Sequence, residues 1–232
     1  MSASTEEIIA LLQSCTPEQR RRIFRELRKE FSIHPLEEEL SIRAEIILEA
    51  IARAGGLTLR MIRGVIAEVA FKIEVIEKLE GWKDITPEGN LPYDFKLDDG
   101  NGPVTIQVKL QRSKGGRPAR AHEGYVRFSQ DMYLIEPQKT RKGEMAGEST
   151  RLYRFGEFDI LAASMQPSTN DWSSFMYTVG DWLLPDTRDK SRVLKFQPIP
   201  MEPNDDWTDD FETCVRWLRS REQKRIRDTP TQ

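Results

Sequence analysis

Cysteine, histidine and long apolar runs are scarce in this chain of 232 residues, and each scarcity excludes a class of protein. Two cysteines and two histidines are too few for a cysteine-rich zinc site or a disulfide framework. No uncharged run approaches the roughly 20 apolar residues of a membrane-spanning helix. The N-terminal residues are polar and acidic, unlike those of a signal peptide. We therefore expect a cytoplasmic protein with two reduced thiols and no membrane partner.

A strong net charge is also lacking, because 35 basic and 38 acidic side chains leave a total of -3. Taken alone, that total argues against a nucleic-acid partner. The charge is unevenly distributed, however. Residues 109–154 contain 11 basic and 5 acidic side chains, a net +6, which leaves -9 for the rest of the chain. A basic segment of this kind suits a polyanion, since phosphate contacts supply much of the affinity of such complexes.

The first part of the chain has helical periodicity. Thr16, Pro17 and Gln19 form a helix start, with a capping threonine, a proline at the first helical position and a glutamine three residues after the cap. This pattern predicts helices over about 16–31, 36–54 and 59–80. The third helix has an apolar stripe that we expect to face the core, made of Ile62, Val65, Ile66, Val69, Ile73 and Ile76.

From residue 82 onward the periodicity changes to two. Residues 91–97 and 104–110 alternate around a turn rich in Asp, Gly and Asn, which predicts a β-hairpin. Shorter apolar runs predict strands over 132–135, 158–163 and 175–178, and a last helix covers about 206–227. This order predicts an α/β (α+β) fold with a mixed central β-sheet.

The hairpin gathers polar side chains on one face of an otherwise apolar sheet. Gln107 and Lys109 are two residues apart and point to the same side. Asp94 lies on the polar side of the preceding strand, so hairpin pairing brings it beside them. A carboxylate and an amide oxygen are hard ligands of the kind that Mg²⁺ prefers, and a lysine can orient water and offset charge on a phosphate.

Pro92-Tyr93-Asp94, followed after 12 residues by Gln107-Val108-Lys109, resembles the motif of the PD-(D/E)xK nuclease superfamily. The resemblance covers about residues 59–180. It implies a restriction-endonuclease-like core, with a mixed sheet flanked by helices, over 59–232 and a separate N-terminal helical segment over 1–58. In this family a glutamate on the helix before the hairpin often joins the site, and Glu68 stands in that place.

The resemblance implies a Mg²⁺-dependent endodeoxyribonuclease, most simply a type II restriction enzyme that cleaves double-stranded DNA as a homodimer. Glu68, Asp94 and Gln107 would be catalytic metal ligands, and Lys109 would position the attacking water. Gln107 departs from the usual Asp or Glu, which removes one negative charge from the metal site. The DNA-contacting side chains would come from the basic segment, as Gln111, Arg112, Lys114, Arg117, Arg120, Lys139, Arg141, Arg151 and Arg154.

Other interpretations remain open at this level. Asp94 with Lys109 also fits a cross-strand surface pair, and Glu68 with Lys72 fits an i,i+4 helix pair. The chain also fits a DNA-binding module with a decayed nuclease core, a repair or recombination nuclease, or a regulator whose N-terminal helices bind DNA or a protein. The basic helix that begins near Arg20 and the stretch from Arg216 to Arg227 fit solvated helix faces or a DNA clamp.

Overall fold

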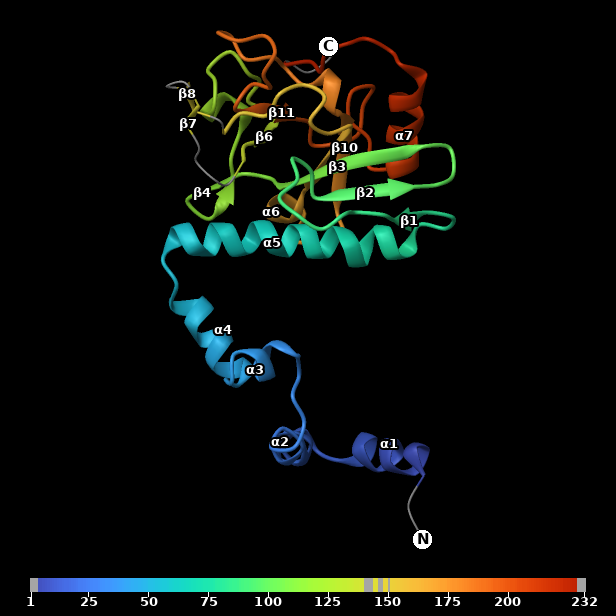
Figure 1. The fold of residues 1–232 in the computed structure, drawn as a ribbon. Coiled ribbons are helices and arrows are strands. Elements are labelled where there is room, and N and C mark those ends of the chain that lie inside the picture. The colour runs from blue at the N-terminus through green and yellow to red at the C-terminus, as the bar shows by residue number, and fades with distance from the viewer. Residues whose placement is uncertain (1–3, 140–143, 146–147, 150, 229–232) are drawn as a thin grey trace. The chain divides into compact units, whose positions relative to one another are not determined.

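The computed structural model describes residues 4–139, 144–145, 148–149 and 151–228. It divides into two compact units, Met1–Leu59 and Arg60–Gln232 (Figure 1). Both cysteines are free thiols. Within the described ranges, no helix is long and apolar enough to cross a membrane.

The first unit is helical. Its helices are α1 (Thr5–Ser14), α2 (Pro17–Leu27), α3 (Leu36–Glu39) and α4 (Ala44–Arg53). The predicted start of α2 is confirmed, because the Thr16 hydroxyl accepts from the Gln19 amide at 3.2 Å and the Gln19 side chain accepts from the Thr16 amide at 2.9 Å. The helix ends at Leu27, four residues earlier than we expected.

The single helix predicted over 36–54 is wrong, because the chain breaks between α3 and α4. Ser41 has a left-handed φ of 51° at the break. The Glu37 carboxylate accepts from the Ala44 amide at 2.6 Å, at the start of α4, and from Arg28 at 2.6 Å. Hydrogen bonds from the Arg28 guanidinium and from backbone amides, that of Ala44 first among them, lower the pKa of Glu37 to about 2. The Glu37 carboxylate, which accepts from the Ala44 amide, thus starts a second helix. Apolar periodicity alone predicted a single helix over this range.

The second unit contains a five-stranded sheet in the order β1-β2-β3-β9-β10. Its strands are β1 (Lys83–Asp84), β2 (Phe95–Asp98), β3 (Pro103–Leu110), β9 (Ile160–Ser164) and β10 (Phe175–Val179). The β3–β9 pair is parallel and the other pairs are antiparallel. The predicted α/β class with a mixed sheet is therefore confirmed, and so is the hairpin, although β2 begins only after Asp94.

Shorter elements surround this sheet. They are η1 (Ile76–Lys78), β4 (Ser113–Lys114), β5 (Arg117–Pro118), η2 (Ala121–Glu123), β6 (Tyr133–Ile135), β7 (Glu144–Met145), β8 (Glu148–Ser149), α6 (Gln166–Thr169), η3 (Gly180–Trp182) and β11 (Gln197–Ile199). The last helix, α7 (Phe211–Ser220), is shorter than predicted, since Asp210 caps its start by accepting from the Thr213 amide at 3.1 Å.

Helices α5 (Gly56–Glu74) and α7 pack on one face of the sheet (Figure 1). The Phe71 ring of α5 lies 5.5 Å from the Phe95 ring, 5.3 Å from that of Phe175 and 6.2 Å from that of Phe211. Ala67 and Ala70 are buried beside it. Small residues at these two positions let the helix backbone approach the sheet closely.

The predicted core stripe of α5 is therefore largely wrong. Val65, Val69 and Ile73 are 56%, 50% and 47% exposed, and Ile66 is also exposed. Only Ile76, in η1, is buried as expected. The face that meets the sheet carries Ala67, Ala70 and Phe71 instead, and Glu68, next to Ala67, is close enough to Asp94 and Lys109 for their charges to act on it.

Gly180 lies where strand β10 ends, and a methyl group there has no space. A Cβ at this position would lie 2.6 Å from the backbone oxygen of Phe158, and the Gly180 amide donates to Asp159 at 2.7 Å, which prevents the chain from moving away. We expect Gly180→Ala to lower the free energy of unfolding by about 1–3 kcal/mol in urea titrations. The control is Gly64→Ala on α5, which meets nothing within 4 Å. Equal stability of the two variants would contradict the prediction.

Candidate functional site

The hairpin brings Asp94 and Gln107 into direct contact. Phe95 pairs with Ile106, and the Asp94 amide donates to the Ile106 carbonyl at 2.9 Å. The Gln107 side-chain amide donates to Oδ2 of Asp94, and the Val108 backbone amide donates to the same oxygen at 2.7 Å. Two donors on β3 thus hold one carboxylate oxygen of Asp94 in place.

Glu68 and Lys109 complete a small cluster of charges around Asp94. Burial and the Asp94 charge raise the pKa of Glu68 to about 7. Burial also raises the pKa of Asp94 and lowers that of Lys109. Each group therefore stands in surroundings that disfavour its charge, which is typical of functional sites.

Neither of the two structural pairings forms a close ion pair. Within the described residues, no ion pair joins Lys109 to Asp94 or Glu68 to Lys72. The charges of Asp94 and Lys109 still act on each other across the hairpin, because each moves the pKa of the other toward the charged form.

The donor set fits a hydrated Mg²⁺ ion. Among the described residues no three His, Cys, Asp or Glu side chains gather as a metal cluster. Mg²⁺ needs fewer protein ligands, since one or two carboxylates commonly hold it together with waters and phosphate oxygens. Asp94 raises the pKa of Glu68, which means that the two carboxylates repel each other. A divalent cation between them would remove that repulsion.

Tyr153 lies beside Gln107, a contact that strand alternation does not predict. Its hydroxyl donates to Oε1 of Gln107 at 2.9 Å, and the residue is only 4% exposed. The ammonium groups of Lys109 and Lys139 lie 5.8 and 5.2 Å from the centre of its ring. Tyr153 is 46 residues from Gln107 in the chain, in an irregular segment, so no periodicity connects the two.

Part of the basic segment forms a short β-hairpin, β4–β5, whose turn is made of Gly115 and Gly116, with φ of 60° and 78°. Two predicted DNA contacts, Lys114 and Arg117, project from it. Arg117 donates twice to Glu123 at 2.9 Å, and Lys114 lies 3.1 Å from the same carboxylate. This group of Lys114, Arg117 and Glu123, called the Glu123 cluster below, holds both cations at the surface.

The other predicted DNA contacts have varied surroundings. Arg112 pairs with Glu136, and Lys139 pairs with Glu157 at 2.6 Å. Arg120 lies over the Tyr133 ring at 4.8 Å, Arg151 donates to the Lys139 carbonyl at 3.4 Å, and Arg154 donates to Ser191 at 3.1 Å. Arg141 lies outside the described residues.

Gln111 does not fit its predicted role as a reader of bases. It is 1% exposed, and its backbone bridges to Ile135 of β6. Within the described residues, its buried side-chain amide has no hydrogen-bond partner.

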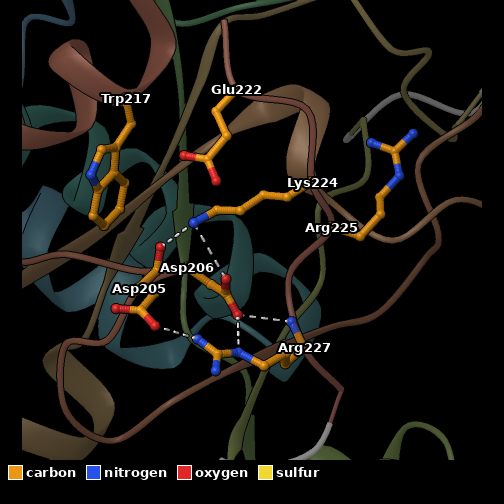
Figure 2. Close-up of a pocket in the computed structure, with 7 residues that line it drawn as sticks. All are labelled: Asp205, Asp206, Trp217, Glu222, Lys224, Arg225 and Arg227. Atoms are coloured by element: carbon orange, nitrogen blue, oxygen red, sulfur yellow. Dashed lines mark hydrogen bonds and ion pairs between the residues drawn. The ribbon is translucent and has the colours of Figure 1, made fainter. Parts of the chain in front are cut away.

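The basic stretch near the C-terminus is structural. Several of its residues help to line a surface cavity of about 550 Å³ (Figure 2). The residues that line this cavity are Asp205, Asp206, Trp217, Glu222, Lys224, Arg225 and Arg227. Arg227 donates to Asp206 at 2.8 Å, and Lys224 lies 4.0 Å from the centre of the Trp182 ring. These contacts attach the tail to the second unit, so the cations at 224 and 227 are already paired.

The chain matches no protein-family model, and a search of curated proteins finds no match. Among solved structures it is similar to a bacterial homing endonuclease, I-Ssp6803I. The two are 21% identical with a TM-score of 0.35, and the match covers 59% of this chain and 84% of that one. The assignment of a function therefore depends on the side chains of the site.

Proposed function

We propose that this protein is a Mg²⁺-dependent endodeoxyribonuclease that cleaves double-stranded DNA, with type II restriction as its role. The observation that carries the proposal is that hydrogen bonds from Gln107 and Val108 hold Asp94 against β3, where its charge acts on both Glu68 and Lys109 and burial displaces the pKa of all three groups. Paired carboxylates beside a desolvated lysine suit phosphodiester hydrolysis better than they suit a structural role.

Asp94 and Glu68 would hold the metal, which when bound would activate a water and offset charge on a phosphate oxygen. Within the described residues the Lys109 ammonium forms no ion pair with a carboxylate, although the charges of Asp94 and Glu68 act on it, so its protons would be available to the attacking water and to the phosphate oxygens. Burial of this cation strengthens its attraction to charge that develops on phosphorus. Water attacks directly, and no covalent enzyme intermediate forms.

DNA would lie along the basic segment next to this site. On the β4–β5 hairpin, the side chains of Lys114 and Arg117 are 63% and 57% exposed, and both pair with Glu123. Lys139, which pairs with Glu157, lies 5.2 Å from the centre of the Tyr153 ring. A homodimer would place two such sites on the two strands of a palindromic target.

A second candidate is a decayed nuclease that binds DNA without cutting it. The observation in its favour is that Gln107 brings no negative charge and that its amide oxygen is occupied by Tyr153. Two carboxylates are then left for a metal. A repair or recombination nuclease would share the chemistry and differ in its target.

The deciding experiment incubates the purified full chain with supercoiled plasmid DNA and Mg²⁺, with EDTA as control, and maps any cut ends. We expect Mg²⁺-dependent double-strand cuts at a fixed sequence. Salt-dependent binding without cleavage would support the decayed module instead. Cuts at junctions or lesions, without a fixed sequence, would support the repair nuclease.

A further inference from the structure

We propose that Gln107 is not a metal ligand but the residue that positions Asp94, and that Tyr153 anchors its amide oxygen. This inference rests on the proposed function, since it concerns the same metal site. It assigns Gln107 and Tyr153 as positioning residues, and it leaves Asp94 and Glu68 as the protein's metal ligands.

The hydrogen-bonding chemistry fixes the direction of the amide. An ionised carboxylate can only accept, so the Gln107 group that faces Asp94 must be the NH₂. The carbonyl oxygen then faces the opposite way, where the Tyr153 hydroxyl donates to it at 2.9 Å. A flipped amide would place two oxygens against each other at Asp94 and lose that hydrogen bond, together with the one that the NH₂ donates to the Val108 carbonyl at 3.2 Å.

Burial separates this amide from the place where a hydrated metal would bind. Gln107 is 1% exposed and Tyr153 is 4% exposed, whereas Asp94 and Glu68 are partly exposed. Both polar ends of the amide are already satisfied inside the protein. A hydrated Mg²⁺ ion keeps several of its waters, so it binds at the partly open carboxylates rather than at a buried amide.

The arrangement leaves one oxygen of Asp94 for the metal. Oδ2 accepts from the Gln107 side chain and from the Val108 amide at 2.7 Å. None of the described hydrogen bonds ends on Oδ1 of Asp94. The network from Tyr153 through Gln107 thus holds Asp94 by one oxygen and presents the other one.

Tyr153→Phe distinguishes this role from direct ligation by Gln107, because the two roles predict different changes in the affinity for the metal. If the Gln107 oxygen were a ligand, removing the Tyr153 hydroxyl would free it, and metal binding would stay the same or tighten. If Gln107 positions Asp94, its amide loses its anchor and metal binding weakens. We expect about 10-fold weaker binding of Mn²⁺, measured on the full chain by electron paramagnetic resonance. Unchanged or tighter binding would overturn the inference.

Tyr125→Phe is the matched control. Its ring packs against Phe128 and Phe196, away from the site, and no described hydrogen bond involves its hydroxyl. We expect it to bind Mn²⁺ as the unsubstituted protein does. Equal weakening by both substitutions would show a general effect of losing a hydroxyl and would overturn the positioning role.

A double-mutant cycle tests the path of the effect. In a Gln107→Ala background, Tyr153→Phe should cause no further loss of Mn²⁺ affinity, because the two residues act in series. Losses that multiply would mean that Tyr153 acts independently of Gln107, which would contradict the proposed network.

Failure of the proposed function has a separate readout. If the unsubstituted protein binds no Mn²⁺, the metal site itself is wrong, and exchange of the Gln107 side-chain amide protons with solvent still tests the network. We expect slow exchange that becomes fast in Tyr153→Phe and in Asp94→Ala. Slow exchange that survives both substitutions would overturn the positioning role without reference to any metal.

Discussion

Lys109→Met is expected to slow DNA cleavage by about 10²- to 10³-fold while making the protein more stable. Burial lowers the pKa of the ammonium although the charges of Asp94 and Glu68 favour its charged form, and within the described residues no ion pair joins it to a carboxylate, so it carries a net desolvation cost in the folded chain. Methionine keeps the length and the apolar contacts of the stem and removes that cost. Catalysis loses the donor that faces the reacting phosphate, which typically lowers the rate by about 10²- to 10³-fold.

Single-turnover cleavage and urea unfolding of the same preparation measure both effects. Lys96→Met is the matched control, since Lys96 lies on β2 two residues from Asp94, where it pairs with Thr105. We expect the control to cleave within a few-fold of the original rate. Cleavage by Lys109→Met at the control's rate would refute the site, and a loss of stability would show that Lys109 serves the fold.

Asp94→Asn is expected to separate DNA binding from cleavage. The substitution removes the negative charge that a divalent metal needs, so cleavage should fall by about 10³-fold. The same loss of charge beside the phosphates should strengthen DNA binding when no metal is present. Asparagine can still accept from the Val108 amide, which donates to Asp94 at 2.7 Å, so the hairpin should keep its shape.

Fluorescence anisotropy in EDTA, followed by cleavage in Mg²⁺, tests this pair of effects. Asp131→Asn removes the same charge from an exposed position within the basic segment, away from the hairpin. It should strengthen metal-free binding slightly and leave cleavage intact. If Asp94→Asn weakened DNA binding without metal, Asp94 would be serving the structure of the DNA surface.

The central part of the site could be predicted from sequence because it is local. Strand alternation and one tight turn determine which side chains of a hairpin share a face, so Asp94, Gln107 and Lys109 came together as expected. Tyr153 could not be predicted, since its contact with Gln107 depends on the course of an irregular segment. The ion pairs of the Glu123 cluster were missed for a similar reason, because they depend on the position of η2.

Helix α5 shows where periodicity misleads. Its most apolar stripe, with Val65, Val69 and Ile73, is exposed, whereas Ala67, Ala70 and Phe71 meet the sheet. Hydrophobicity identifies an amphipathic helix, but the shape of the partner decides which face it uses. A large aromatic flanked by small residues fits the pocket formed by Phe95, Phe175 and Phe211 better than a row of branched side chains does.

The parallel pairing of β3 with β9 also has a kinetic consequence. The Thr105 amide on β3 donates to the Asp159 carboxylate, which lies 54 residues further along the chain, just before β9. The strands β3 and β9 are direct neighbours in the sheet. Closing a loop of that length costs entropy before any contact repays it, which slows folding. The β2–β3 hairpin needs no such closure and forms early. Asp94 and Gln107 should therefore meet while the chain is still largely unfolded, and Tyr153 should join them only when the molecule completes its sheet.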